Sequence, residues 1–328
     1  NLLDPGKTPS ENIQFLVFLM AVIKAVDEYA DLLRISVASA GNDHRLGANE
    51  APPAVVSIFL GDELTEVLKS IENDTYFTSH GAVQMDIGAT VLPHFVKDNT
   101  DRNRTSPFAF TGNKFEFRML GSAASVANPN IVLNTAVAEA LDQFAKELDG
   151  VAPEDMEHAV HELIKRAIKK HKRVIFNGNG YTDEWIEEAE KRGLYNLKST
   201  PDALPMWIAQ KNIDLFTKHS IFTSEELHSR YEIWLENYSK TINIESNTMV
   251  QKDLLPSVMS YIEEIASTAS LKASVVPGIT CESETTLITK LSGLQDAMTK
   301  GLEKLKSDTA KAKATEDVLE NAKLYQAE

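Results

Sequence analysis

The segment NRTSPFAFTGNKFEFR, residues 103–118, combines a short alternating pattern with a local group of cations. Within it, in KFEFR at residues 114–118, two phenylalanines alternate with Lys114, Glu116 and Arg118. Side chains of a β-strand point alternately to opposite faces, so a strand here packs its phenylalanines on one face and aligns its charges on the other. The segment therefore predicts a strand whose polar face carries one carboxylate between two cations.

Two interpretations of this charged face are open from the residues alone. Charge normally lies on the solvated surface of a protein, so the face can be exposed without any function. A carboxylate between cations can also hold a divalent metal beside a phosphate, and arginines such as Arg102 and Arg104 in the preceding loop suit bidentate contacts with anions. The second interpretation predicts an anion site.

The composition limits the classes of protein to which the chain can belong. Its 328 residues, 43% hydrophobic and 25% charged, suffice for two domains or for one large domain with an appendage. The formal net charge of −15 disfavours general attraction to nucleic acid and to membrane surfaces. The longest apolar run is interrupted by Lys24, so no membrane helix is predicted. A single cysteine, Cys281, excludes a disulfide framework and suits a reducing cytoplasm.

Helices and strand-like segments alternate in the first part of the chain. A capping pattern, Thr-Pro-Ser-Glu at residues 8–11, predicts a buried helix that runs to about Leu33. Residues 54–60 are short and β-branched, which fits a strand or the start of a buried helix, and residues 62–72 have helical spacing. Residues 81–92 alternate like a strand. The mixture predicts an α+β fold.

The second part of the chain has mainly helical patterns. Thr182, Thr200 and the Thr223–Glu226 box are plausible helix starts. The predicted helices span about 129–148, 153–171, 182–192, 201–211, 223–240 and 248–270. Beyond them, apolar residues recur at alternating spacings of four and three: Leu287, Leu291, Leu294, Met298, Gly301 and Leu305. This seam predicts a helical hairpin or bundle at about 245–328.

A long loop at residues 36–53, SVASAGNDHRLGANEAPP, contains Arg45 and Glu50 five residues apart. Its glycines and its proline pair prevent regular structure, and long loops often carry function. Arg45 and Glu50 can form a surface salt bridge and nothing more. Alternatively the loop is a lid, in which Arg45 binds a carboxylate and Glu50 acts as a base or cation ligand.

Two weaker patterns point to structure rather than chemistry. His158 and His161 do not match the HExxH zinc motif and predict an exposed helix face. NGNG at residues 177–180 lacks the ending of a phosphate loop and predicts turns.

Three longer motifs carry a family resemblance. HRLGANEAPP at residues 44–53 is followed by DRNRTSPFAFTGNKFEFRMLGS at 101–122 and ANPNIVLNTAVAEAL at 127–141. In this order and spacing they resemble the C-terminal catalytic half of glutamine synthetase in its large type III form, most strongly over residues 1–150. The resemblance implies that residues 1–150 contribute to an antiparallel-sheet half-barrel packed with helices, and that residues 151–328 form a mainly helical extension.

The family makes glutamine from glutamate, ammonium and ATP through γ-glutamyl phosphate, with Mg²⁺ or Mn²⁺. By resemblance, Arg45 and Arg118 bind the glutamate substrate. Glu50 resembles the lid glutamate that binds and deprotonates ammonium. Arg104 resembles the arginine that stabilises the transferring phosphoryl group.

The resemblance also assigns two residues of the strand. Glu116 resembles a carboxylate ligand of the metal next to the ATP phosphates. Lys114 stands where the family usually has a phosphate-binding arginine, so its contact with phosphate is a point charge rather than a fork. Shorter family members carry a further arginine where this chain has Ala109, so the remaining phosphate contacts must come from elsewhere.

The resemblance places other parts of the enzyme upstream of these motifs. They are the N-terminal β-grasp domain, further metal carboxylates and a metal histidine. Active sites of the family form between subunits of a dodecamer of two hexameric rings, so the 328 residues alone are expected to be inactive. Two other functions are weighed: a guanidino kinase, which the GANEAP and ANPN segments disfavour, and a non-catalytic homologue acting as an assembly or regulatory module.

Overall fold

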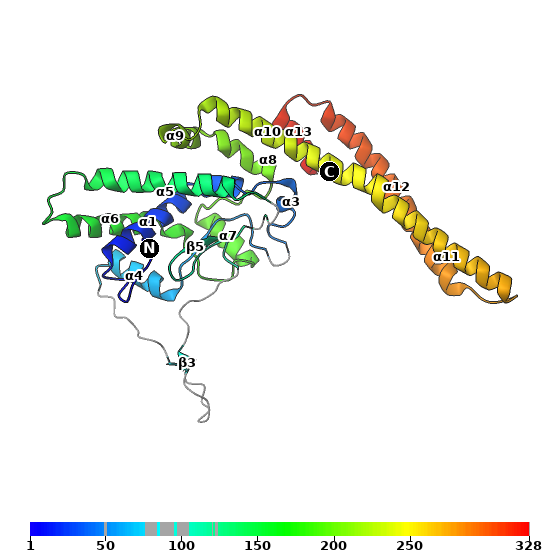
Figure 1. Ribbon diagram of the computed structural model, residues 1–328, viewed down its shortest axis with the longest axis horizontal. Helices are drawn as coiled ribbons and strands as arrows, with labels where there is room; N and C mark the ends of the chain where they lie inside the picture. The colour runs from blue at the N-terminus through cyan, green and yellow to red at the C-terminus, as the bar shows by residue number, and fades with distance from the viewer. Residues whose placement is uncertain are drawn as a thin grey trace. The chain divides into compact units, whose positions relative to one another are not determined.

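The computed structural model describes residues 1–48, 51–75, 84–85, 95–96, 105–119, 121 and 124–327. These residues form two compact units, Asn1–His228 and Ser229–Glu328. The chain is mostly helical and has a small mixed sheet in the first unit, so the predicted α+β class is confirmed (Figure 1). The boundary near residue 150 that the sequence suggests stays a prediction.

The first unit contains short strands between helices. Its strands are β1 (Ile58–Phe59), β2 (Gln84–Met85), β3 (Phe95–Val96), β4 (Phe108–Phe110) and β5 (Phe115–Phe117). Its α-helices are α1 (Ile13–Glu28), α2 (Ala30–Ile35), α3 (Ala40–Asp43), α4 (Asp62–Glu72), α5 (Ala127–Leu148), α6 (Met156–His171), α7 (Asp183–Lys191), α8 (Thr200–Ala203), α9 (Gln210–Lys218) and the start of α10 (Ser224–Asn243). Two short 3-10 helices are η1 (Lys172–Val174) and η2 (Leu204–Ile208).

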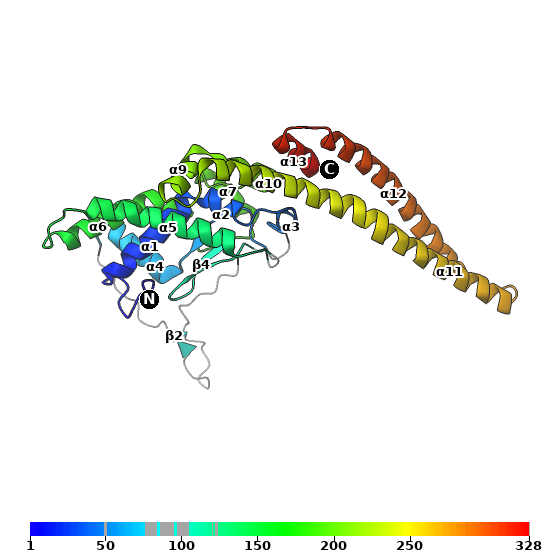
Figure 2. The same ribbon diagram turned by 45° about the horizontal axis from the view of Figure 1, so that its top comes forward.

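Helix α1 forms the centre of the first unit. It packs against both α5 and α6, which Figures 1 and 2 show beside it. From Leu19 to Asp27 every residue of the helix is buried, Lys24 and Asp27 included. A helix that is apolar all round belongs in a protein interior, as the sequence predicts.

The start of this first helix differs from the prediction. Its N-cap is Asn12, whose side chain accepts a hydrogen bond of 3.0 Å from the Phe15 backbone N–H. Thr8, the predicted cap, lies in a preceding turn in which its carbonyl accepts from Glu11 N–H. Asparagine caps at least as well as threonine, and the Asn12 amide also binds the Asp4 carbonyl.

Most other helix starts agree with their sequence signals. Thr182 caps α7 by accepting from Trp185 N–H. The capping box before α10 is formed, because Thr223 Oγ1 accepts from Glu226 N–H and the Glu226 carboxylate accepts from Thr223 N–H. Helix α8 is capped by Ser199, one residue before the predicted start.

The described three-stranded sheet has the order β1-β4-β5 and is mixed. Strand β4 pairs in parallel with β1 and antiparallel with β5. In this register Ala109 lies directly opposite Glu116, and Phe108 opposite Phe117. Strands β2 and β3 form a separate antiparallel pair. The resemblance implied an antiparallel sheet, and the parallel pairing of β1 with β4 shows that this part of the prediction is wrong. The half-barrel itself stays a prediction.

The second unit is a long helical arrangement. It contains the end of α10 together with η3 (Ile244–Leu254), α11 (Leu255–Val275), α12 (Glu282–Lys313) and α13 (Val318–Ala327). Element η3 is a π-helix that joins α10 to α11 without the predicted break at 241–247. It precedes Pro256, whose ring excludes the usual hydrogen bond to residue i−4. Helices α11 and α12 pack against each other (Figure 2).

The buried face of α12 agrees only in part with the seam of apolar residues predicted from the sequence. Leu291, Met298 and Leu305 face inward as predicted, and Leu302 rather than Gly301 is buried. Leu294 is 57% exposed. The spacing of four and three is thus present in the sequence, but contact with the neighbouring helices decides which of these residues are buried.

Candidate active site

Strand β5 has the two faces that the sequence predicts. Phe115 packs against Phe108 and Phe110, with ring centroids 5.0 Å and 5.2 Å away. Phe117 also contacts Phe108, at 6.0 Å. Because these aromatic rings share one face of the β4–β5 pair, Glu116 is left on the other. The hairpin thus fixes the position of the charged group.

Glu116 is the centre of this charged group. Its Oε2 accepts hydrogen bonds from Arg118 Nε at 3.0 Å and Nη2 at 2.7 Å. Its Oε1 lies 3.3 Å from Thr111 Oγ1, which donates to it, and 3.7 Å from Lys114 Nζ. The hydrogen bond from Arg118, with the charges of Arg118 and Lys114, holds the pKa of the Glu116 carboxyl below its ordinary value. The carboxylate is therefore ionised at neutral pH, as metal ligation requires.

Ala109 occupies the cross-strand position opposite Glu116. It is 1% exposed, and a methyl group donates no hydrogen bond. The cations found around Glu116 in the described residues, Lys114 and Arg118, therefore come from the two positions that flank β5. The position where shorter family members are expected to have an arginine is thus paired directly with Glu116 across the two strands.

The segment that carries Arg45 is attached to the end of β5. Helix α3 is capped by Ser39, and Asn42 within it donates hydrogen bonds to the Val37 carbonyl at 2.8 Å and to the Met119 carbonyl at 3.2 Å. Arg45 itself is exposed and follows α3 by two residues. The structure thus brings the segments of Arg45 and Arg118 together through the Asn42 side chain, which binds the Met119 carbonyl.

The prediction that residues 36–53 have no regular structure is wrong at α3 (Ala40–Asp43), which begins at the Ser39 cap. A backbone hydrogen bond closes the later part of this loop. Gly47 N–H donates to the Pro52 carbonyl at 2.8 Å. Gly47 has φ +76°, a left-handed conformation that glycine adopts without steric cost. Glu50 lies outside the described residues, as does Arg104, so the predicted roles of these two residues stay predictions.

A buried arginine, Arg34, holds α3 in place. Arg34 is 1% exposed, and its Nη2 donates to Asp43 Oδ1 at 2.8 Å. Its Nε donates to the Leu197 carbonyl at 2.7 Å, and Asp43 also accepts from Thr200 N–H. Burial raises the pKa of the Asp43 carboxyl, against the opposing effect of Arg34. Arg34 thus anchors α3, and with it the Arg45 loop, to the segment before α8.

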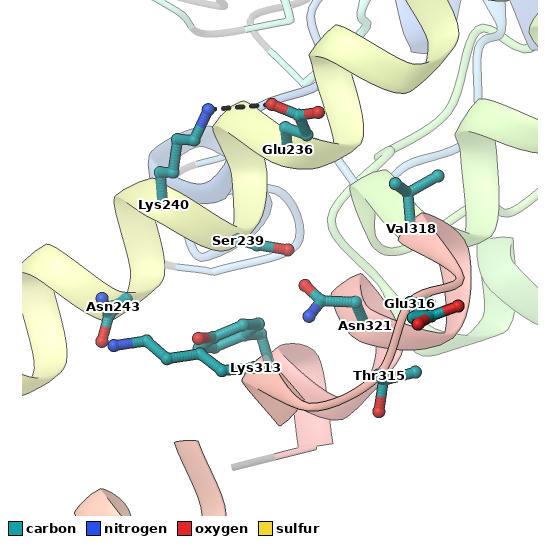
Figure 3. A pocket seen from close by; sticks show the side chains of 10 residues that line it. Glu236, Ser239, Lys240, Asn243, Lys313, Thr315, Glu316, Val318 and Asn321 are labelled. Atoms are coloured by element: carbon teal, nitrogen blue, oxygen red, sulfur yellow. Dashed lines mark hydrogen bonds and ion pairs between the residues drawn. The ribbon is translucent and has the colours of Figure 1, made fainter. Parts of the chain in front are cut away.

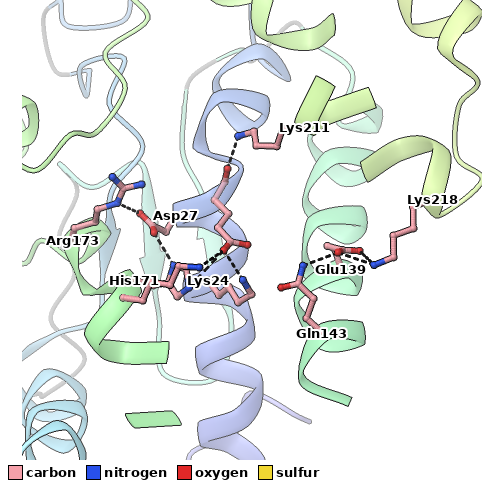
Figure 4. A network of polar contacts seen from close by, with 10 residues as sticks. Lys24, Asp27, Glu139, Gln143, His171, Arg173, Lys211 and Lys218 are labelled. Carbon is pink, nitrogen blue, oxygen red and sulfur yellow. Dashed lines mark hydrogen bonds and ion pairs between the residues drawn. The ribbon is translucent and has the colours of Figure 1, made fainter. Parts of the chain in front are cut away.

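Sequence reasoning missed a network of charges buried around α1 (Figure 4). Asp27, 5% exposed, accepts from Arg173 Nε at 2.7 Å and lies 2.8 Å from His171 Nδ1. Asp31, fully buried, pairs with Lys211 Nζ at 3.0 Å. The only signal in the sequence was the presence of charged residues within an apolar helix. Their partners lie more than a hundred residues away and could not be identified.

A second group of polar residues fits a metal site poorly. Asp74, His161 and Glu162 bring one ligand atom each within 4.8 Å of one another, the single such group in the part of the chain that the structure describes. Lys165 already binds the Asp74 carboxylate, and its hydrogen bond lowers the Asp74 pKa. An ammonium group in this position competes with a metal ion, so Glu116 remains the stronger candidate ligand.

Helix α10, the segment 313–316 and α13 enclose a small pocket of about 270 Å³ in the second unit (Figure 3). Figure 3 shows the Ser239 hydroxyl pointing toward Asn321. This hydroxyl is buried and has no hydrogen-bond partner among the described residues. The pocket contains none of the residues that the sequence assigns to substrates.

Comparisons with known proteins indicate the same family as the sequence resemblance. The glutamine synthetase C-terminal domain matches residues 159–272. A glutamine synthetase of Butyrivibrio fibrisolvens is 52% identical over 334 residues, which cover 99% of this chain and 47% of that protein. A type-3 glutamine synthetase of Dictyostelium discoideum is 50% identical over 283 residues, covering 85% of this chain and 38% of that protein.

A glutamine synthetase of Bacteroides fragilis is 40% identical over 270 residues, covering 80% of this chain and 37% of that protein. The chain therefore belongs to the glutamine synthetase family. Within the family it is similar to the type III form, as the sequence motifs predicted. It spans less than half the length of these curated relatives. Among the described residues, every helix is too short or too polar to cross a membrane.

Proposed function

We propose that this chain forms part of a glutamine synthetase that ligates ammonium to glutamate at the expense of ATP, through γ-glutamyl phosphate. The observation that carries the proposal is the polar face of β5, where Glu116 lies between Arg118 and Lys114. The names of its relatives support the same activity. An ionised carboxylate between cations suits a site that must accept both a metal ion and anionic substrates.

The cationic residues have distinct roles in this proposal. Arg45 and Arg118 bind the carboxylate groups of glutamate, since a guanidinium group binds a carboxylate in a bidentate manner. Arg104 and Lys114 bind the ATP phosphates, and Arg104 stabilises the charge that develops on the transferring phosphoryl group. Loss of one such donor typically costs about 3 to 4 kcal/mol of transition-state stabilisation, or about 100- to 1,000-fold in rate.

Glu116 would hold Mg²⁺ or Mn²⁺. Its carboxylate oxygens are hard ligands of the kind these ions prefer, and a carboxylate has acceptor sites beyond the hydrogen bonds that Arg118 and Thr111 donate. A bound divalent ion supplies charge neutralisation between the phosphates of ATP and glutamate. One carboxylate cannot complete such a site, so other ligands come from outside the described residues.

Glu50 deprotonates ammonium and, as part of a lid, keeps water from the acyl phosphate. The support for a lid is the Gly47–Pro52 hydrogen bond, which joins the two ends of the short segment that contains Glu50. Closure would protect an intermediate that hydrolyses readily. It would also bring Glu50 to the bound substrate.

The proposal includes parts that this chain does not contain. We propose that β1, β4 and β5 belong to a half-barrel completed by further strands, in which β4 pairs antiparallel with β5 and in parallel with β1. An N-terminal β-grasp domain from a neighbouring subunit closes the site, in a cytoplasmic homo-oligomer, a dodecamer of two hexameric rings. The 328 residues alone are then inactive.

The metal dependence of the full-length enzyme tests the proposal. We expect Glu116→Gln to raise the Mn²⁺ concentration for half-maximal glutamine formation by at least about tenfold, because the variant loses an anionic ligand. Glu157→Gln, on the exposed part of α6, is the matched control and should leave the Mn²⁺ requirement unchanged. An unaltered requirement in Glu116→Gln would refute Glu116 as a ligand.

A further inference from the structure

A pocket of about 630 Å³ lies in the first unit, between α4 on one side and α6 and η1 on the other. The segment 175–178 and Arg192 complete its walls. Its volume is typical of pockets that bind small molecules. None of the residues assigned above to glutamate, ATP or metal lines it.

The walls of this pocket are strongly cationic. Its described lining includes six cations and one carboxylate, Glu72. The cations are Lys69, Lys169, Lys170, Lys172, Arg173 and Arg192. The chain as a whole has a net charge of −15, so this lining is opposite in sign to the molecule around it. Such a local concentration of charge attracts anions into the cavity.

The cations of the pocket differ in their partners. Lys172 Nζ binds Glu72 at 2.6 Å, and Arg192 donates to the Glu188 carboxylate and to the Ile175 carbonyl. The ammonium groups of Lys69 and Lys169, by contrast, form no ion pair with any residue of the described ranges, and both side chains are exposed. They come from α4 and α6 and are therefore available to a ligand from opposite walls.

The inner surface of the pocket is apolar and fixed in shape. Leu68, Ile168 and Phe176 line it, and Phe176 stacks on Trp185 with ring centroids 3.7 Å apart. A Cβ at Gly178 would lie 2.6 Å from the Phe176 ring, so only glycine fits at this point. The cavity is thus preformed, which lowers the entropic cost of binding.

The Asn177 side chain holds the same wall in place. Its Oδ1 accepts from Leu60 and Gly61 N–H, and its Nδ2 donates to Thr65 Oγ1 at 2.8 Å. These hydrogen bonds connect the segment 175–178 to the start of α4. The segment 175–178 is therefore held against the start of α4.

We propose that this pocket binds a small phosphorylated ligand with an aromatic body, of the size of a nucleoside diphosphate. Lys69 and Lys169 bind the phosphates, and the apolar inner surface contacts the ring, whereas Lys170 is paired with Glu28 at 3.4 Å. A lining of six cations, in which the carboxylate Glu72 is already paired with Lys172, suits phosphate oxygens, and the apolar wall suits a base. The strongly acidic chain disfavours a nucleic acid as the occupant, since a long polyanion would be repelled by the surrounding surface.

Calorimetric titration of the 328-residue chain with ADP, in buffer that contains EDTA, tests this inference. The EDTA removes divalent ions, so binding does not depend on a metal at Glu116. We expect ADP to bind, and the double variant Lys69→Glu/Lys169→Glu to weaken binding by at least about tenfold because two charge-assisted contacts are lost. Inorganic pyrophosphate should bind more weakly than ADP.

Two control variants make the result specific. Lys290→Glu/Lys300→Glu on α12 changes the net charge equally at exposed sites far along the sequence, and should leave the ADP affinity within about twofold. Glu116→Gln should also leave it unchanged, whereas tighter binding in this variant, which frees Lys114 and Arg118 from their carboxylate partner, would assign the heat to β5 instead. Four results would each overturn the proposal. The parent chain does not bind ADP, or both lysine-pair variants lose the same affinity for ADP. Alternatively, pyrophosphate binds as tightly as ADP, or a single-stranded oligonucleotide binds more tightly than ADP.

Discussion

Two groups of paired charges in the first unit have opposite surroundings. Around α1, α2 and α3, Asp27, Asp31 and Arg34 are nearly or fully buried, and each has a partner at 2.7 to 3.0 Å. On β5, Glu116 also has cationic partners, but its side chain is 40% exposed and that of Lys114 is 64% exposed. The chemistry of the two groups is the same, and only their contact with water differs.

This difference in exposure to water indicates which charged pairs stabilise the fold and which can bind a ligand. A buried charge that loses its partner cannot be rehydrated, so its removal is costly. An exposed pair contributes little to stability because water replaces either partner. For the same reason the exposed pair can exchange its partner for a metal ion or a substrate. The buried group should therefore tolerate substitution poorly, and the β5 group should tolerate it well as far as folding is concerned.

The largest expected effect is that of Arg34→Met. The substitution leaves Asp43 and two carbonyls without their donor in the interior, and we expect a loss of about 3 to 5 kcal/mol in the free energy of unfolding. Urea denaturation followed by circular dichroism measures it. Arg166→Met, which removes an exposed arginine paired with Glu147, is the control and should lose less than about 1 kcal/mol. Similar losses in the two variants would remove the contrast between buried and exposed pairs.

An intermediate effect is expected between α5 and α9. Lys218 donates to Glu139 at 2.6 Å and pairs with Asp142 at 2.8 Å. Hydrogen bonds from Lys146 and Lys218 lower the pKa of Asp142 to about 2. Although burial opposes them, hydrogen bonds from Lys218, Gln143 and His219 also hold the pKa of Glu139 below its ordinary value.

The pH dependence of stability follows from the direction of these shifts. A carboxyl group whose pKa is lower in the folded state stabilises that state above its unfolded pKa, and this contribution is lost as the pH falls through the folded value. Lys218→Met should therefore melt at a lower temperature than the parent chain at pH 7. The difference should narrow from about pH 4.5 to about pH 2 as the carboxylates protonate. A difference that stays constant over this range would show that Lys218 acts through packing alone.

The sequence could predict features that depend on neighbouring residues. The alternation in β5, the capping box before α10 and the Thr182 cap each involve residues at most three positions apart, and each is present in the structure. The partners of Asp27 and the carbonyl partner of Arg34 at Leu197 could not be predicted, because tertiary packing brings them from segments more than a hundred residues away. The link between Asn42 and Met119, which brings the Arg45 segment to β5, has the same origin.

The cationic pocket could be predicted from the sequence only in part. Four of its six cations, Lys169, Lys170, Lys172 and Arg173, form a visible basic run in the sequence. A basic run at the end of a helix is also what the helix dipole favours, so the run by itself indicated no site. Only the fold shows that α4 supplies Lys69 opposite to it.

The smallest expected effect on stability is that of Glu116→Gln. The substitution keeps the size of the side chain and removes an exposed charge, so we expect the melting temperature of the 328-residue chain to change by less than about 2 °C. The same substitution is expected to alter the metal requirement of the full-length enzyme strongly. A residue that affects metal binding but not folding acts in the site. Arg34, by contrast, is expected to affect folding. A large drop in melting temperature for Glu116→Gln would place this carboxylate with the structural pairs of α1, and any loss of activity would then follow from unfolding rather than from a missing ligand.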